Sequence, residues 1–115
     1  MKNIITIAIL ATVLVACKSN HVSFDGIKVF DGRFNVALET NEKEKINKLE
    51  TLFNDRVEFN EIAPTFKYLI EFDTPGGTER WKYSQQGYTQ KYNPEDQRIF
   101  ALLNKEQFNE LAHIN

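Results

Sequence analysis

The chain has 115 residues, a length that suits one domain, and carries 14 basic and 16 acidic residues for a formal net charge of −2. This mild acidity, without a basic cluster, excludes nucleic acid and anionic lipid headgroups as expected partners. Cys17 is the only cysteine, so no disulfide can form within the chain. The fold must therefore depend on its hydrophobic core.

The first sixteen residues have the layout of a secretory signal peptide. Lys2 supplies a positive charge, and residues 4–16 form an almost uninterrupted apolar run that ends in small residues. A membrane-spanning helix needs about 20 apolar residues, and this run is shorter. We therefore predict a targeting segment over residues 1–16 and export of the chain.

The end of this segment, Leu14-Val15-Ala16-Cys17, resembles the lipobox of bacterial lipoproteins. The resemblance covers the signal alone and implies cleavage before Cys17 and a lipid anchor on its sulfur. The alternative is an ordinary signal peptide cleaved near Ala16, which would leave a free thiol. Because Lys18 and not aspartate follows, the resemblance implies the periplasmic face of the outer membrane if the host has two membranes. The predicted layout is a signal peptide (1–16), a lipidated cysteine with a short tether (17–23) and one domain (24–115). Without the signal peptide and its Lys2, residues 17–115 carry a formal charge of −3.

The first part of the domain reads as a hairpin followed by a helix. Two apolar runs, 27–30 and 33–38, flank Asp31-Gly32, which predicts a hairpin with a two-residue loop. Residues 41–54 predict a helix with a capping box formed by Asn41 and Glu44, and with apolar residues on one face. Its opposite face is charged, and Glu44 and Lys48 stand in the favourable i, i+4 order.

From Val57 onward the apolar residues recur with the period of two that is typical of strands. Residues 74–77 connect two of these strands, and two registers remain open. One places Ile70 opposite Trp81 and Glu71 opposite Arg80, and the other pairs Phe72 with Trp81 and Glu71 with Lys82. Either register gathers the apolar side chains on one face and the charged ones on the other.

The last third changes its pattern twice. Tyr88 and Tyr92 have the opposite parity to Trp81 and Tyr83, and a bulge at Gly87 would return them to the same face. Residues 93–96, with the sequence Asn-Pro-Glu-Asp, predict a helix start, and apolar residues continue to Ala112 with a break at residue 104. One kinked helix or two short helices would fit.

Together these elements predict an α+β domain. We expect an antiparallel sheet of about four to six strands, one helix after the N-terminal hairpin, and a C-terminal helix or helix pair on one sheet face.

Residues with catalytic or ligand-binding chemistry are sparse and scattered. The two histidines, His21 and His113, are far apart, and Ser84 stands outside any nucleophile motif. The Gly76-Gly77 pair is followed by no lysine at phosphate-loop spacing. We therefore expect no enzyme, no cofactor and no metal.

The function that remains is binding. We expect a lipid-anchored cell-envelope protein that binds another protein near the membrane, by class-level analogy with small inhibitory, immunity or exclusion lipoproteins. Aromatic residues in excess of the core are typical of interface hot spots. The alternatives are an accessory or structural subunit of an envelope assembly and a small-molecule carrier with an apolar pocket between sheet and helices. The candidate contact residues are Arg80, Trp81, Lys82, Tyr83, Tyr88 and Tyr92.

Overall fold

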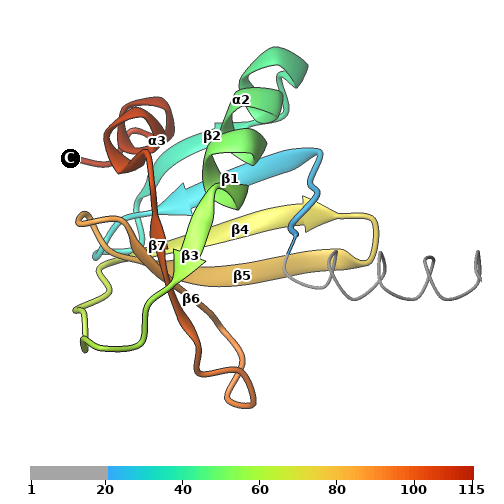
Figure 1. Cartoon of the computed structure of the whole chain (residues 1–115). Coiled ribbons are helices and arrows are strands. Elements are labelled where there is room, and N and C mark those ends of the chain that lie inside the picture. The colour runs from blue at the N-terminus through green and yellow to red at the C-terminus, as the bar shows by residue number, and fades with distance from the viewer. Residues whose placement is uncertain (1–20) are drawn as a thin grey trace, which may run out of the picture.

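The computed structural model describes residues 21–115, so the predicted signal peptide, Cys17 and most of the tether lie outside the described residues. The domain is α+β, as predicted, with one seven-stranded antiparallel sheet and two helices on one of its faces (Figure 1). Seven strands exceed the predicted four to six, and the strand order is β2-β1-β4-β5-β6-β7-β3. Within residues 21–115, neither helix has the length and apolarity needed to cross a membrane. The elements are β1 (Gly26–Phe30), β2 (Val36–Thr40), α2 (Lys43–Asn54), β3 (Arg56–Glu58), β4 (Tyr68–Thr74), β5 (Gly77–Tyr83), β6 (Tyr88–Lys91), β7 (Ile99–Leu102) and α3 (Lys105–Ala112).

The first hairpin, β1–β2, is present, but its predicted two-residue loop is wrong. The loop spans residues 31–35, because the Asp31 carboxylate accepts hydrogen bonds from the backbone N–H groups of Arg33 at 2.8 Å and Asn35 at 2.9 Å. These bonds stabilise a wider turn than Asp-Gly alone would make. Phe34 takes a left-handed backbone conformation with φ of 61° and is 76% exposed. The loop thus turns a predicted strand residue toward solvent.

Helix α2 has the buried face that its sequence period predicts. Ile46, Leu49 and Phe53 are buried, and Lys48 forms an ion pair with Glu44 at 3.8 Å on the exposed face. The predicted capping box is wrong, since no side chain caps the first turn.

The register of β4 and β5 is the first of the two predicted alternatives. Ile70 lies opposite Trp81 and Glu71 opposite Arg80, and pairing continues to Thr74 and Gly77, so the loop itself is Pro75-Gly76. Arg80 Nε donates to Glu71 Oε2 at 2.9 Å across the two strands.

The predicted bulge at Gly87 is replaced by a three-residue loop over residues 85–87. Gly87 has φ of +89°, its N–H donates to the Ser84 carbonyl at 2.9 Å, and Tyr83 pairs with Thr89. Because the loop has an odd number of residues, residues that share a face on the two strands are either all odd-numbered or all even-numbered. Tyr88 therefore does not lie on the same face as Tyr83. It faces the opposite side of the sheet.

The helix predicted to begin at residue 93 is wrong, because residues 93–96 form a turn that leads into strand β7. The Asn93 side-chain oxygen accepts a hydrogen bond from the Glu95 N–H at 3.0 Å, and the Asp96 N–H donates to the Asn93 carbonyl at 3.0 Å. Asn-Pro initiates turns as well as helices, so the signal was ambiguous. Strand β7 pairs with both β6 and β3, and only the second helix of the predicted pair, α3, is formed.

The segment before β1 belongs to the domain and not to the tether. Val22 is 4% exposed and exchanges two hydrogen bonds with the Asn54 side chain, each of 2.8 Å. The predicted tether over residues 17–23 is therefore too long at its C-terminal end. The chain from Cys17 to Val22 can span at most about 18 Å.

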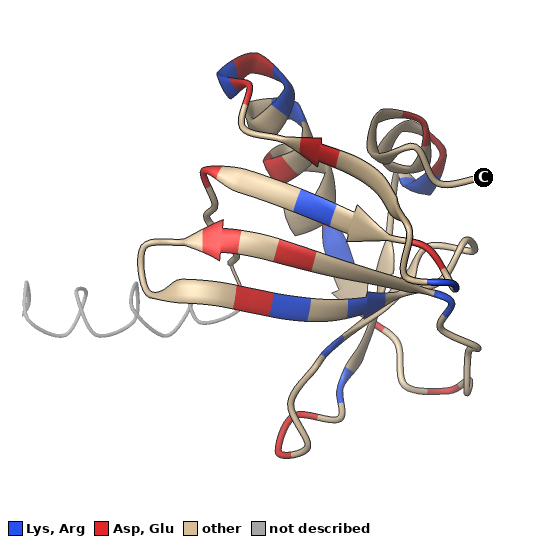
Figure 2. Ribbon diagram, turned by 180° about the vertical axis from the view of Figure 1, so that it is seen from behind, with Lys and Arg blue, Asp and Glu red and all other residues tan. Residues whose placement is uncertain are grey.

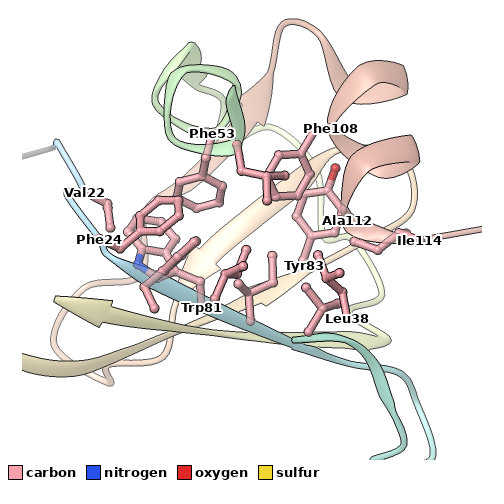
Figure 3. Close-up of a cluster of buried hydrophobic side chains, with 14 of the residues drawn as sticks. Val22, Phe24, Leu38, Phe53, Trp81, Tyr83, Phe108, Ala112 and Ile114 are labelled. Atoms are coloured by element: carbon pink, nitrogen blue, oxygen red, sulfur yellow. The ribbon is translucent and has the colours of Figure 1, made fainter. Parts of the chain in front are cut away.

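Interlocking rings fill the layer between the sheet and the helices (Figure 3). Phe53 of α2 lies at their centre, with ring centroids 4.8 Å from Phe72, 5.2 Å from Trp81 and 5.8 Å from Phe108. These rings occupy the space in which a small-molecule carrier would need its pocket. The carrier alternative gains no support from this packing.

Candidate partner-binding face

Both helices pack on one face of the sheet, which we call the inner face, and within residues 21–115 the opposite outer face carries no helix (Figure 2). Alternation along β4 and β5 turns Ile70, Phe72, Trp81 and Tyr83 inward, so the residues between them point outward. The six candidate contact residues are therefore divided between the two faces. Arg80, Lys82, Tyr88 and Tyr92 lie on the outer face, and Trp81 and Tyr83 do not.

Trp81 and Tyr83 belong to the core, which corrects their place among the candidate contact residues. They are 4% and 0% exposed. Trp81 Nε1 donates to Glu79 Oε2 at 2.8 Å, and the Tyr83 hydroxyl donates to Asn109 Oδ1 at 2.6 Å. Burial raises the pKa of Tyr83 well above its usual value, so the hydroxyl stays protonated as a donor. Neither side chain can contact a partner while the domain is folded.

Tyr88 faces outward but is half covered. The ring of Phe59, at the start of the segment that crosses from β3 to β4, stacks on it with a centroid separation of 6.2 Å and an interplanar angle of 17°. Tyr88 therefore contributes less free surface than its position on the strand suggests.

The remaining outward residues form a shallow groove beside the β1–β2 loop. Tyr92 is 61% exposed, and the Lys82 ammonium lies 5.4 Å from its ring centroid and 5.9 Å from that of Phe66. The groove has a volume of about 650 Å³. We call it the aromatic groove and define it by Phe34, Phe66, Leu69, Arg80, Lys82 and Tyr92.

Three groove residues are absent from the sequence-based site: Leu69 and the two phenylalanines, Phe34 and Phe66. Both phenylalanines count as core residues when their hydrophobicity alone is considered. For Phe34 a usable signal exists, since it stands in a Gly-Arg-Phe-Asn stretch whose glycine and asparagine favour a turn. No comparable signal marks Phe66, whose position follows from the irregular segment that connects β3 and β4.

The groove is locally cationic in a chain whose net charge is −2. Lys67, Arg80 and Lys82 line it, together with one acid, Asp31. Backbone hydrogen bonds from Asn35 and Arg33 lower the pKa of Asp31, so its carboxylate is ionised and already engaged by amides. The balance at the groove is positive.

Two other polar side chains that the sequence offers as candidates for chemistry, Ser84 and His113, have structural partners. Ser84 is buried, and its hydroxyl accepts a hydrogen bond from the Tyr88 N–H at 3.1 Å. His113 Nδ1 lies 3.2 Å from the Ala37 carbonyl oxygen. In the part of the chain that the structure describes, no group of three or more histidine, cysteine, aspartate or glutamate side chains could hold a metal ion. The groove combines cations and rings, an arrangement suited to binding.

Comparison of the chain with protein-family models, curated proteins and solved structures gave no match.

Proposed function

We propose that this chain is an exported, lipid-anchored and non-enzymatic cell-envelope protein that binds another protein through the aromatic groove. One observation carries the proposal: two exposed rings, Phe34 and Tyr92, flank the same groove as Lys82 on a sheet face that neither α2 nor α3 covers. Exposed tyrosine and phenylalanine beside basic groups are typical of interface hot spots.

The composition of the groove favours transient binding over the alternative of a permanent assembly subunit. Stable assemblies bury extended apolar surfaces, whereas transient interfaces have a polar rim. Here Lys67 and Arg80 border the rings, and both are exposed. A partner that binds and dissociates fits such a surface better than one that docks permanently.

The position of the groove also agrees with membrane anchoring through Cys17. Val22, the first core residue, binds Asn54 at the C-terminal end of α2 on the inner side, next to the start of β1. The groove lies on the outer side, beyond the opposite end of β1 at Asp31. A lipid anchor on Cys17 would hold the end near Val22 toward the bilayer and present the groove away from it.

Site-specific photocrosslinking in native membranes tests the binding face. The photoreactive residue p-benzoylphenylalanine replaces Phe34, Tyr92 or, as a matched exposed control on α2, Lys48. We expect adducts with another protein from positions 34 and 92 and none from position 48. Equal adducts from all three positions, or none from the two groove positions, would refute the proposed binding face.

Metabolic labelling with a palmitate analogue tests the anchor. We expect label on the wild-type chain and none on Cys17→Ser. Equal labelling of the two proteins would contradict lipidation at this cysteine.

A further inference from the structure

The charges and rings of the aromatic groove indicate what kind of partner it takes. We infer, on the basis of the proposed function, that it binds an extended acidic segment of the partner, in which a carboxylate stands two positions from an aromatic or large aliphatic side chain. Lys82 would receive the carboxylate, and the neighbouring rings would receive the apolar side chain.

The first step of the argument is the charge that remains after internal pairing. Arg80 is paired with Glu71 at 2.9 Å, and the Asp31 carboxylate is engaged by the amides of its own loop. Among the described residues, no carboxylate forms an ion pair with Lys67 or Lys82. These two ammonium groups are thus the unneutralised charges of the groove, and an anionic partner complements them.

The second step is the environment of Lys82. Its side chain is half buried, and its ammonium lies 5.9 Å from the ring centroid of Phe66 and 5.4 Å from that of Tyr92. Its nearest polar partner is Gln90 Oε1 at 3.5 Å, a weak hydrogen bond. A carboxylate that reaches this ammonium would be flanked by apolar rings, and partial exclusion of water strengthens a charge pair.

The third step is the spacing. In an extended segment, side chains two positions apart point to the same side and are separated by roughly 7 Å. The ammonium of Lys82 and the ring of Tyr92 are 5.4 Å apart, a similar separation. One acid-x-aromatic unit can therefore contact both at once. A free phosphate or a lipid headgroup would satisfy the cation and leave the rings of Phe34 and Tyr92 in water.

A charge-reversal series in the crosslinking experiment tests whether acidity selects the partner. With the photoreactive residue at position 34, Lys82→Glu should lower the yield of adduct roughly tenfold, because the carboxylate then faces a like charge. Lys48→Glu on α2 is the matched control and should leave the yield unchanged. Lys82→Gln, which removes the charge and keeps a polar side chain, should give an intermediate loss, and circular dichroism confirms that each variant is folded.

The outcomes separate this inference from the proposed function. No adduct at positions 34 and 92 in the wild type would reject the binding face itself. An adduct that survives Lys82→Glu would keep the binding face and reject the acidic segment. An adduct with twice the mass of the chain would identify a second copy as the occupant and would also overturn the inference.

Defined peptides provide the second test. The full chain in lipid nanodiscs is titrated with three fluorescent peptides: a Ser/Gly-rich peptide that contains Asp-Ser-Phe, the same peptide with Lys-Ser-Phe, and the same peptide with Asp-Ser-Ala. We expect the Asp-Ser-Phe peptide to bind at least tenfold more tightly than either of the others, and Lys82→Glu to reverse the preference between the aspartate and lysine peptides. Equal binding of the three peptides would overturn the inference. So would displacement of the aspartate peptide by inorganic phosphate at constant ionic strength, since the groove would then be a general anion site.

Discussion

The two faces of the sheet use similar residues in opposite ways. On the inner face, Phe53 meets Phe72 and Trp81 at 4.8 Å and 5.2 Å, and all three rings are buried. On the outer face, Phe34 and Tyr92 are exposed, and the ammonium of Lys82 lies near the Tyr92 ring. Aromatic content therefore does not identify a binding site. The position of each ring relative to the helices decides whether it contributes stability or free surface.

The largest expected difference between the faces is in stability. Phe53→Ala should lower the free energy of unfolding by about 3–5 kcal/mol, because it removes the ring at the centre of the core and leaves a cavity. Tyr92→Ala, on the outer face, should change it by no more than about 0.5 kcal/mol. Urea denaturation followed by circular dichroism measures both. Similar losses for the two variants would mean that the outer rings are part of the stabilising core.

A smaller difference is expected between two loop glycines. Gly87 has φ of +89°, and a Cβ there would lie 2.7 Å from the Cβ of Lys105 at the start of α3. Gly87→Ala should therefore destabilise the domain by about 2–3 kcal/mol, from backbone strain and from displacement of the helix. In the solvent-exposed β4–β5 loop, the nearest atom to a Cβ at Gly76 is 3.9 Å away, so Gly76→Ala should be nearly neutral. Thermal unfolding compares the two variants. An unchanged Tm for Gly87→Ala would show that α3 can shift to accommodate the added methyl group without loss of stability.

The smallest expected effect belongs to the ion pair on the outer face. Arg80 and Glu71 are joined at 2.9 Å, with side chains 52% and 23% exposed. A double-mutant cycle with Glu71→Ala and Arg80→Ala should give a coupling free energy of about 0.2–1 kcal/mol, which should shrink in 1 M salt. A coupling that is larger and insensitive to salt would show that the outer face is more shielded from water than its exposure indicates.

The sequence was most informative where hydrophobic alternation is long. The period of two along residues 68–83 predicted both faces of β4 and β5 and the outward position of Arg80 and Lys82, and the period of α2 predicted its buried face. Each of these elements has one apolar face, and the burial of that face outweighs competing local sequence preferences.

The errors arose where short-range signals have two interpretations. Asn-Pro begins turns as well as helices, and the run Ile99–Leu102 is too short for periodicity to distinguish a strand from a helix. Residues 99–102 form a strand because they pair with β3, which lies more than forty residues earlier in the chain. No local sequence pattern carries that information. The same holds for the site, because the cover of Phe59 on Tyr88 depends on a connecting segment without a regular period.

In the described part of the chain, residues 21–115, the strand order leaves two free edges, β2 and β3. Unpaired edges can recruit strands from other copies and begin aggregation, a risk that the proposed lipid anchor would increase by concentrating the protein in two dimensions. Both edges are poor templates for such pairing. Strand β3 has only three residues, and two of them are charged. Strand β2 carries an exposed glutamate, Glu39, and its Ala37 carbonyl lies next to the His113 ring. These features protect the edges of the open sheet against pairing with strands of other copies, while the outer face remains available.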